Sequence, residues 1–261
     1  PRWIIPDIVP EGVNFLIAPP KMYKSWFVLD VTTSLALGAP VLGIETTQQK
    51  TLYLALEDNQ RRLKNRIERQ NIGDIRHAKC ALTTTWKSGA EGLLQLHNYI
   101  QAEKPGVIGI DTLGVFSRIK DYRDYAETTD IMTGLKNLSH ENNTSIILVH
   151  HTRKSQAGSS DDDFLERTLG SQGITGGADS ILNISKKRNT EDAILSITGR
   201  DVEEQELAIR FNKLNCRWEL LGKSYEVADS AQRQEIINLL KSEGSLTPSE
   251  IADNLNKNKS T

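Results

Sequence analysis

Cysteine is nearly absent from this chain, which contains only Cys80 and Cys216. Two thiols cannot build a disulfide framework, and these two lack the paired spacing of a zinc site. We therefore expect a protein of the reducing cytoplasm. The sequence also lacks a signal peptide and any apolar run of about 18 residues, the length that a membrane span requires. Neither secretion nor contact with a membrane is indicated.

A net positive charge is lacking as well. Lys and Arg number 32 against 34 Asp and Glu, which gives a formal net charge of -2. No overall basic field draws the chain onto a polyanion, so any contact with nucleic acid must be local. Hydrophobic residues make up 38% and charged residues 25% of the 261 residues. This composition is typical of a globular protein, and the length fits one large α/β domain with a small appendage.

Apolar runs of strand length alternate with amphipathic stretches of helix length, the pattern of a mostly parallel sheet covered by helices. The first strands are expected at residues 13–18, 51–57, 79–84, 107–111 and 145–151. The helices between them are expected at residues 25–37, 59–70, 91–103 and 125–142. Four later strands, at residues 180–185, 193–198, 206–211 and 217–221, lie close together. They predict an antiparallel extension of the sheet.

The end of the chain changes character. Residues 230–242 are amphipathic, Gly244 marks a turn, and Thr247 with Pro248 opens another helix with a cap and a proline at its first position. This predicts a main domain over residues 1–225 and the start of a C-terminal winged-helix or helix-turn-helix module over residues 226–261. Because the sequence begins without Met and stops inside this helical pattern, we expect a piece of a longer protein.

A candidate phosphate-binding loop follows the first strand and opens a helix. Lys24 and Ser25 match the pattern of such loops, whereas Ala18 and Tyr23 stand where glycines are expected. If Tyr23 adopts a positive φ, the cost is roughly 1–2 kcal/mol, which packing can offset. The residues expected to bind nucleotide are Ala18, Pro19, Pro20, Lys21, Met22, Tyr23, Lys24, Ser25 and Trp26. From this segment alone, an ordinary strand-to-helix turn with a solvated lysine is an equal alternative.

Carboxylates follow two other expected strands. Glu57 and Asp58 end the second strand, and Asp111 ends the fourth, so these side chains should meet at the carboxyl edge of the sheet, beside the loop. Carboxylates in this place are what metal-assisted hydrolysis needs. In this interpretation Glu57 orients the attacking water, while Asp111 and Ser25 bind Mg²⁺. A solvated strand terminus explains either carboxylate alone, but not both in this order.

Two further candidates also follow strands. His150 and His151 end the strand at residues 145–151, where a polar side chain can contact a γ-phosphate and respond to its loss. Histidines in such a place are more often structural, and without carboxylates at ligand spacing they do not indicate zinc. Arg200 can serve as an arginine finger for the nucleotide of a neighbouring subunit. The plainer alternative is a surface ion pair with Asp201 or Glu203.

The order of several short motifs carries a resemblance. The motifs are Lys24–Trp26, Leu54–Asp58, Ile110–Leu113, Val149–Lys154, Leu169–Ser171, Gly177–Asp179 and Thr198–Asp201. Together they resemble the RecA-like hexameric helicase superfamily, and within it the plasmid RepA-type ATPases of mobile genetic elements. The resemblance runs from Trp3 to Trp218. It implies a P-loop NTPase fold, ATP and Mg²⁺ as cofactors, and a homo-oligomer, which in this superfamily is a hexameric ring.

The resemblance also implies roles for individual residues. Lys24 contacts the phosphates, Glu57 is the catalytic base, Asp111 is the Walker B aspartate and His151 is the γ-phosphate sensor. Arg200 is the finger of a neighbouring subunit. The DNA-facing loops fall on residues 153–167 and 170–177. The candidate contacts with single-stranded DNA are Arg153, Lys154, Arg167 and Ser171.

The sequence therefore predicts an α/β fold: a RecA-like P-loop NTPase core with a mostly parallel central sheet, extended by antiparallel strands and followed by a truncated helix-turn-helix segment. The expected function is that of an ATP-hydrolysing motor or helicase in DNA replication of a plasmid, phage or integrated element. Two alternatives stay open. One is a nucleotide-gated DNA-binding initiator or regulator with weak or no hydrolysis, and the other is a non-catalytic assembly module.

Overall fold

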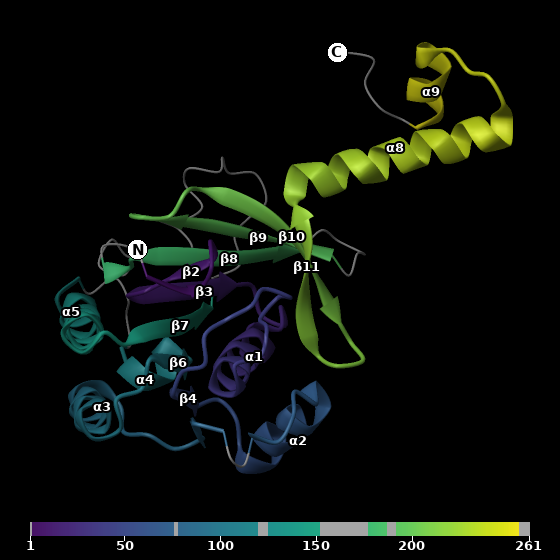
Figure 1. Ribbon diagram of the computed structural model, residues 1–261. Helices are drawn as coiled ribbons and strands as arrows, with labels where there is room; N and C mark the ends of the chain where they lie inside the picture. The colour runs from purple at the N-terminus through teal and green to yellow at the C-terminus, as the bar shows by residue number, and fades with distance from the viewer. Residues whose placement is uncertain (1, 76–77, 120–124, 152–176, 187–191, 256–261) are drawn as a thin grey trace.

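A nine-stranded sheet forms the centre of the part of the chain that the structure describes (Figure 1). The computed structural model describes residues 2–75, 78–119, 125–151, 177–186 and 192–255. The strand order is β11-β10-β9-β8-β3-β7-β6-β4-β5. The strands are β3 (Val13–Ala18), β4 (Thr51–Ala55), β5 (Cys80–Thr83), β6 (Val107–Asp111), β7 (Ser145–His151), β8 (Ser180–Lys186), β9 (Asp192–Gly199), β10 (Gln205–Asn212) and β11 (Arg217–Lys223). A separate two-stranded sheet consists of β1 (Trp3–Ile5) and β2 (Val9–Pro10).

The sheet has a parallel part and an antiparallel part. Every neighbouring pair from β8 to β5 is parallel, whereas β9, β10 and β11 are added in antiparallel fashion. The predicted mixed sheet is confirmed. The prediction for residues 180–185 is wrong in one respect, because β8 pairs in parallel with β3 and the antiparallel extension begins only at β9. The first five residues of β8 are buried, as expected of a strand inside a sheet covered on both faces.

Helices cover both faces of the parallel part (Figure 1). On one face lie α1 (Lys24–Leu37) and α2 (Gln60–Gln70), and on the other α3 (Gly89–Glu103), α4 (Leu113–Ser117) and α5 (Tyr125–Asn142). Alternate residues of β3 enter two separate apolar cores. Leu16 and Ala18 pack with α1, whereas Phe15 and Ile17 pack with α3, α4 and α5. Burial on both faces fixes β3 at the centre of the sheet, and with it the start of the loop that follows Ala18.

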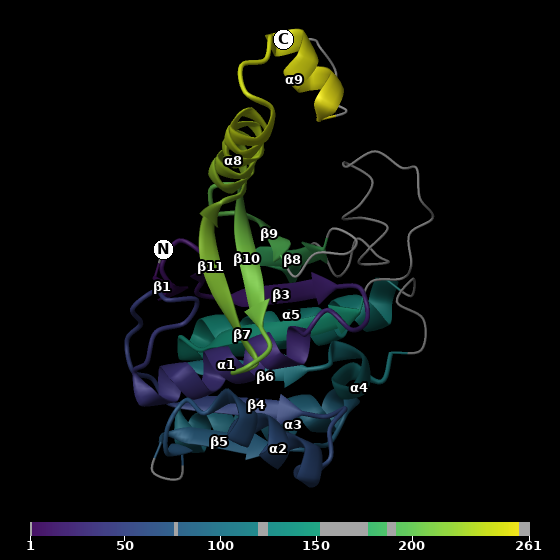
Figure 2. The same cartoon turned by 90° about the vertical axis from the view of Figure 1, so that its right-hand side faces the viewer.

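The C-terminal helices leave the sheet (Figure 2). Strand β11 continues without a turn into α8 (Ser224–Glu243), which projects beyond the sheet and is followed by α9 (Pro248–Asn254). The predicted end at Gly244 and the Thr247 cap of α9 are confirmed, the cap as a capping box with Glu250. The expected helix start at residue 230 is wrong, and the expected domain boundary at residue 225 falls in the first turn of α8. That these helices begin a winged-helix module stays a prediction.

Three short elements were not expected from the sequence. Strands β1 and β2 and helix α4 have at most five residues each, too few to give a periodic pattern. Within the described ranges, no helix combines the length and the apolar character that crossing a membrane requires. The polar segment that the sequence analysis assigns to a DNA-facing loop, residues 153–167, lies outside the described residues.

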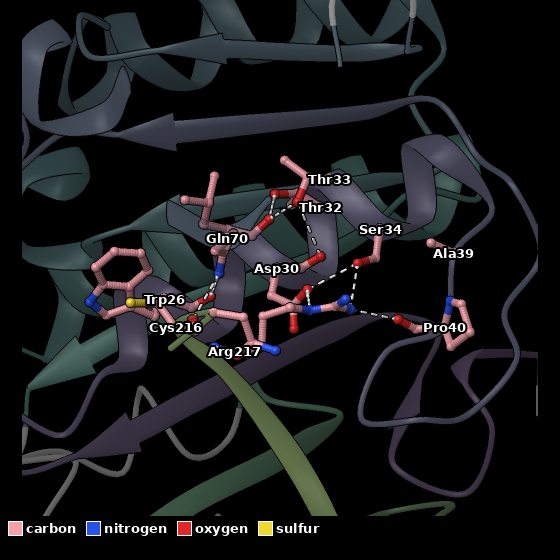
Figure 3. Close-up of polar contacts among 12 residues, drawn as sticks. Trp26, Asp30, Thr32, Thr33, Ser34, Ala39, Pro40, Gln70, Cys216 and Arg217 are labelled. Atoms are coloured by element: carbon pink, nitrogen blue, oxygen red, sulfur yellow. Dashed lines mark hydrogen bonds and ion pairs between the residues drawn. The ribbon is translucent and has the colours of Figure 1, made fainter. Parts of the chain in front are cut away.

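A polar cluster joins α1 to the beginning of β11 (Figure 3). Arg217 donates from Nε to Asp30 Oδ1 at 2.9 Å, and from Nη2 to Ser34 Oγ at 3.2 Å and Pro40 O at 2.8 Å. Ser34 Oγ donates to the same oxygen of Asp30 at 2.9 Å. Burial raises the pKa of Asp30, and the guanidinium of Arg217 opposes that rise. The cluster therefore depends on Arg217 to keep a buried carboxylate ionised.

Gln70 of α2 makes a second link between the same elements (Figure 3). Its Nε2 donates to the carbonyl oxygen of Trp26 in α1 at 2.9 Å and to that of Cys216 before β11 at 3.2 Å. Gln70 is 2% exposed, so both bonds are shielded from water. Together the two links hold the β10–β11 hairpin against α1.

Replacing Arg217 with Met is expected to lower the free energy of unfolding by about 2–3 kcal/mol, because the carboxylate of Asp30 loses its cation. Without Arg217 the pKa of Asp30 rises further. At pH values between the pKa of Asp30 in the unfolded chain and its pKa in the folded variant, the folded state keeps a proton that the unfolded state has released. The free energy of unfolding of the variant therefore falls as pH rises through this interval. Urea unfolding should therefore show a larger deficit at about pH 7 than at about pH 5.

A matched control is Arg210→Met, which removes an ion pair with Asp192 whose side chains are 50% and 43% exposed. Its loss should stay below about 1 kcal/mol at both pH values, because exposed pairs contribute little. Equal losses in the two variants, or an Arg217→Met deficit that is the same at both pH values, would show that Asp30 does not depend on Arg217.

Candidate active site

The carboxyl ends of the parallel strands bring the predicted site residues together. The register pairs Ala18 at the end of β3 with His151 at the end of β7, and Asp111 at the end of β6 with Ala55 at the end of β4. Because β7 lies between β3 and β6, all these ends meet on one edge of the sheet. Ligands of open α/β sheets bind outside this edge.

Tyr23 adopts the backbone conformation that a glycine would favour. Its φ is 56° and its ψ is 25°, in the left-handed region. Its ring stacks on Phe211, with the centroids 3.9 Å apart and the planes at 3°, and meets Trp218 edge-on at 6.4 Å. A side chain with a Cβ is disfavoured in this conformation, so the loop needs packing that offsets the cost. These two aromatic contacts are that packing.

Lys24 is buried at the start of α1, with 4% of its surface exposed. Its Nζ donates to Ala18 O at 2.6 Å and to Pro19 O at 3.0 Å, so the ammonium lies against the carbonyls of its own loop. Burial lowers the pKa of Lys24 to about 8, although the negative charges of Asp111 and Glu57 act to raise it. This is a cation held inside the fold, and not the solvated lysine of the plainer alternative.

Asp111 is buried at the end of β6, with 2% of its surface exposed. Tyr53 donates its hydroxyl to Oδ2 at 2.9 Å, whereas Oδ1 accepts no hydrogen bond within the described structure. Burial raises the pKa of Asp111, and the nearby hydroxyl of Ser25 and the hydrogen bond from Tyr53 oppose the rise. A buried carboxylate oxygen without a donor is costly. Mg²⁺ binds such oxygens and commonly uses only one or two carboxylates, so Asp111 and the hydroxyl of Ser25 fit this ion.

Glu57 lies beyond the end of its strand. The predicted strand over residues 51–57 is confirmed up to Ala55, but its predicted end is wrong, because the chain turns after Ala55, where Asp58 N donates to Ala55 O at 3.1 Å. Thr112 Oγ1 donates to Glu57 Oε1 at 2.9 Å, and His151 Nε2 lies 3.5 Å from Oε2. The contact with His151 is the largest influence that lowers the pKa of Glu57. The site thus holds an ionised, half-exposed carboxylate directed by two neighbours.

Two contributors to the site were missed by the sequence analysis. Tyr53 lies inside β4 and follows the pattern of a core residue, and only the pairing of β4 with β6 reveals that its hydroxyl reaches Asp111. Arg66 of α2 forms an ion pair with the buried carboxylate of Asp58 and lies over the ring of Trp26 at 5.4 Å. An arginine on a charged helix gives no signal of this position, because most such residues are solvated.

Arg200 does not join this cluster. Gly199 pairs with Ser180 at the amino end of β8, and Arg200 N donates to Asp179 O at 3.0 Å. Since β8 is parallel to β3, Arg200 lies at the edge of the sheet opposite to Lys24. There it lines a polar cleft of about 620 Å³. Arg200 is therefore too far away to act on the phosphate loop of its own chain.

The four residues expected to contact DNA lie outside the described residues. Their role stays a prediction. They are Arg153, Lys154, Arg167 and Ser171.

The buried ammonium of Lys24 predicts how stability responds to alkaline pH. Because its folded pKa, about 8, lies below the ordinary value of 10.5, the unfolded chain binds more protons in that interval and stability rises with pH. Lys24→Met lacks this effect. Without nucleotide, the free-energy difference between the variant and the wild type should move by roughly 2 kcal/mol in favour of the wild type between about pH 7 and pH 9.5.

Chemical denaturation of both proteins across this range gives the measurement. Taking the difference between them cancels the titration of other groups. A difference that does not change with pH would mean that Lys24 is solvated in the folded state.

Comparison with known proteins agrees with this geometry. Residues 1–157, which include Lys24, Glu57, Asp111 and His151, match the family described as AAA domain. No curated protein matches the sequence significantly. Among solved structures, the chain is similar to a DnaB-like replicative helicase described with its interactions with primase, with a TM-score of 0.59 and 14% identity.

The alignment with that helicase covers 80% of this chain and 57% of the other, so this chain spans little more than half the length of that protein. At this identity the likeness shows the fold alone, an α/β fold with a large mixed sheet that matches a RecA-like core. The family match covers more than half of the sequence. The chain therefore belongs to the AAA domain family.

Proposed function

We propose that this chain binds ATP with Mg²⁺ and hydrolyses it, as a motor or helicase-like protein that acts on DNA. The observation that carries the proposal is the pair of opposite charges, Lys24 and Asp111, buried together at the carboxyl edge of the sheet. Burying two charges is costly unless further partners compensate them. A phosphate on Lys24 and a cation on the open oxygen of Asp111 are such partners.

In this proposal the loop and the start of α1 hold the phosphates. Backbone amides at the beginning of a helix attract anions, and the ammonium of Lys24 adds its charge. Ser25 and Asp111 hold Mg²⁺, and Tyr53 fixes the carboxylate of Asp111 through its hydroxyl. When bound, the ion supplies positive charge that offsets the charge developing on the phosphates.

Glu57 orients the attacking water. Its carboxylate is ionised and half-exposed, and the hydrogen bond from Thr112 fixes one of its oxygens. His151 lies at the other oxygen and at the end of β7, next to the loop. We assign to it the role of sensing the γ-phosphate, because loss of that phosphate changes the charge that faces the imidazole.

Arg200 serves the site of a neighbouring copy. Its position at the opposite edge of the sheet excludes it from the site of its own chain, and a head-to-tail ring joins two different surfaces of adjacent subunits, which allows this edge to face the site of the next copy. There its guanidinium stabilises charge on the transferred phosphoryl group. A homo-oligomer, with a hexameric ring as its proposed form, is therefore part of the mechanism.

The biological setting is a finer part of the proposal. The motif order points to a RepA-type ATPase in the replication of a plasmid, phage or integrated element, acting on single-stranded DNA in the cytoplasm. The protein with the similar structure is a replicative helicase that interacts with primase. A shared fold is consistent with replication but does not carry function by itself.

One observation favours a second candidate, a nucleotide-gated DNA-binding initiator or regulator with little hydrolysis. Tyr23 replaces a glycine in the loop and holds a strained conformation. This departure from the glycine of other such loops is the feature that supports binding of ATP with little turnover. A non-catalytic assembly module is the remaining alternative if ATP does not bind.

Steady-state ATP hydrolysis is the test. Turnover should rise with protein concentration and with single-stranded DNA, and it should fall by at least about 100-fold in Glu57→Gln, which cannot accept the hydrogen bond of the water as an anion. Glu68→Gln is the matched control, since Glu68 is exposed on α2 and, in the part of the chain that the structure describes, pairs with Lys64 on the same helix. Binding with turnover no higher than in Glu57→Gln would support the gated regulator and contradict the motor.

The role of Arg200 in a neighbouring copy predicts complementation. Arg200→Ala and Glu57→Gln should each be nearly inactive, whereas a 1:1 mixture assembled together should regain roughly a quarter of wild-type turnover. Half of the sites keep Glu57, and half of those lie beside an intact Arg200. A protein that carries both substitutions, assembled on its own, should stay inactive. No recovery in mixed assemblies would rule out a role for Arg200 across the interface.

A further inference from the structure

The conformation of Tyr23 fixes how helix α1 begins. Its carbonyl oxygen accepts the amides of Trp26 and Phe27, both at 3.1 Å, so the first turn of α1 depends on this one residue. A residue with a Cβ resists the left-handed region that Tyr23 occupies, whereas glycine enters it freely. Something outside the loop must therefore hold Tyr23 in place.

Within the described residues, the aromatic contacts of Tyr23 come from the β10–β11 hairpin. Phe211 of β10 stacks on its ring at 3.9 Å, and Trp218 of β11 meets it edge-on at 6.4 Å. The indole Nε1 of Trp218 also donates to the carbonyl oxygen of Tyr23 at 3.5 Å. Phe211 and Trp218 are cross-strand partners, with 4% and 3% of their surfaces exposed. These two buried rings form a rigid aromatic surface against which Tyr23 packs.

The hairpin itself is anchored to α1 independently of the loop. Arg217 binds Asp30, and Gln70 joins the carbonyls of Trp26 and Cys216, as Figure 3 shows. These anchors hold the hairpin and the helix together. The stack of Phe211 on Tyr23 is therefore not needed to attach the hairpin to α1. Removing its ring leaves the polar anchors in place, but it takes away the contacts of Phe211 with Trp26 at 6.4 Å and Trp218 at 5.3 Å as well as the stack on Tyr23.

We infer that Phe211 is a positioning residue for the phosphate loop, which it holds, through Tyr23, in the conformation that glycine gives to other such loops. Trp218 supports it from the neighbouring strand. The inference rests on the proposed function, because its consequence is the affinity for ATP. The inference also gives a role to the antiparallel part of the sheet. Its strand β10 contributes Phe211, which allows a loop with Tyr23 in place of glycine to bind ATP.

The first test is a double-variant cycle that measures the dissociation constant of a non-hydrolysable ATP analogue with Mg²⁺. Phe211→Leu keeps an apolar side chain but removes the ring, and should weaken binding roughly threefold to tenfold. In a Tyr23→Gly background the same substitution should cause no further loss, because glycine needs no stack. Phe211→Tyr, which keeps the ring, should bind within about twofold of the wild type.

Ile209→Val is the matched control. Ile209 lies on the same strand and is fully buried, so the substitution costs stability of a similar kind, about 0.5–1.5 kcal/mol, and leaves the ring of Phe211 stacked on Tyr23. It should leave binding unchanged. Equal losses from Phe211→Leu in the wild type and in the Tyr23→Gly background would overturn the inference, and so would no loss in either.

Tyr23→Ala keeps the test decisive should Phe211→Leu not fold. Alanine retains the Cβ that disfavours the left-handed region but offers no ring to Phe211. It should bind the analogue about tenfold more weakly than Tyr23→Gly. Binding by Tyr23→Ala as tight as that by Tyr23→Gly overturns the inference. Failure of the wild type itself to bind would instead refute the proposed function, so the two failures are distinguishable.

Discussion

The burial of two opposite charges at one edge of the sheet sets the terms for the rest of the structure. Lys24 and Asp111 both lose hydration. Burial lowers the pKa of Lys24 and raises the pKa of Asp111, so it favours the neutral form of each. The carbonyls of the loop and the hydroxyl of Tyr53 compensate part of this cost. One oxygen of Asp111 remains without a donor in the described part of the chain. The described part of the fold does not fully compensate these two buried charges. A ligand that brings both a phosphate and a cation would supply the missing partners.

The direction of the strands explains the division of the remaining roles. Parallel strands deliver the loop, Asp111 and His151 to one edge, and the reversal at β9 carries Arg200 to the other. The next reversal brings the end of β10 back to the loop, where Phe211 meets Tyr23. One sheet thus contributes the site, Phe211, which packs against the loop of that site, and Arg200, which is proposed to act on the next subunit.

Residue spacing alone predicted much of the parallel core, because buried strands and the residues at their ends follow local patterns. The strand limits of β3, β6 and β7 agree with the expected ones. What depends on pairing between distant segments could not be read in this way. The direction of β8, the contact between Tyr53 and Asp111, and the stack of Phe211 on Tyr23 all follow from the order of strands in the sheet. Short elements such as α4 were missed because a few residues show no period.

In the proposed function, Lys24 and Asp111 form a site for a phosphate and a cation together. Calorimetric titration with a non-hydrolysable ATP analogue, with Mg²⁺ and with a chelator, tests it most directly. We expect Mg²⁺ to strengthen binding in the wild type and to have no such effect in Asp111→Asn. Wild-type binding that is indifferent to Mg²⁺, or absent at every concentration of the analogue, would show that these two residues do not form such a site.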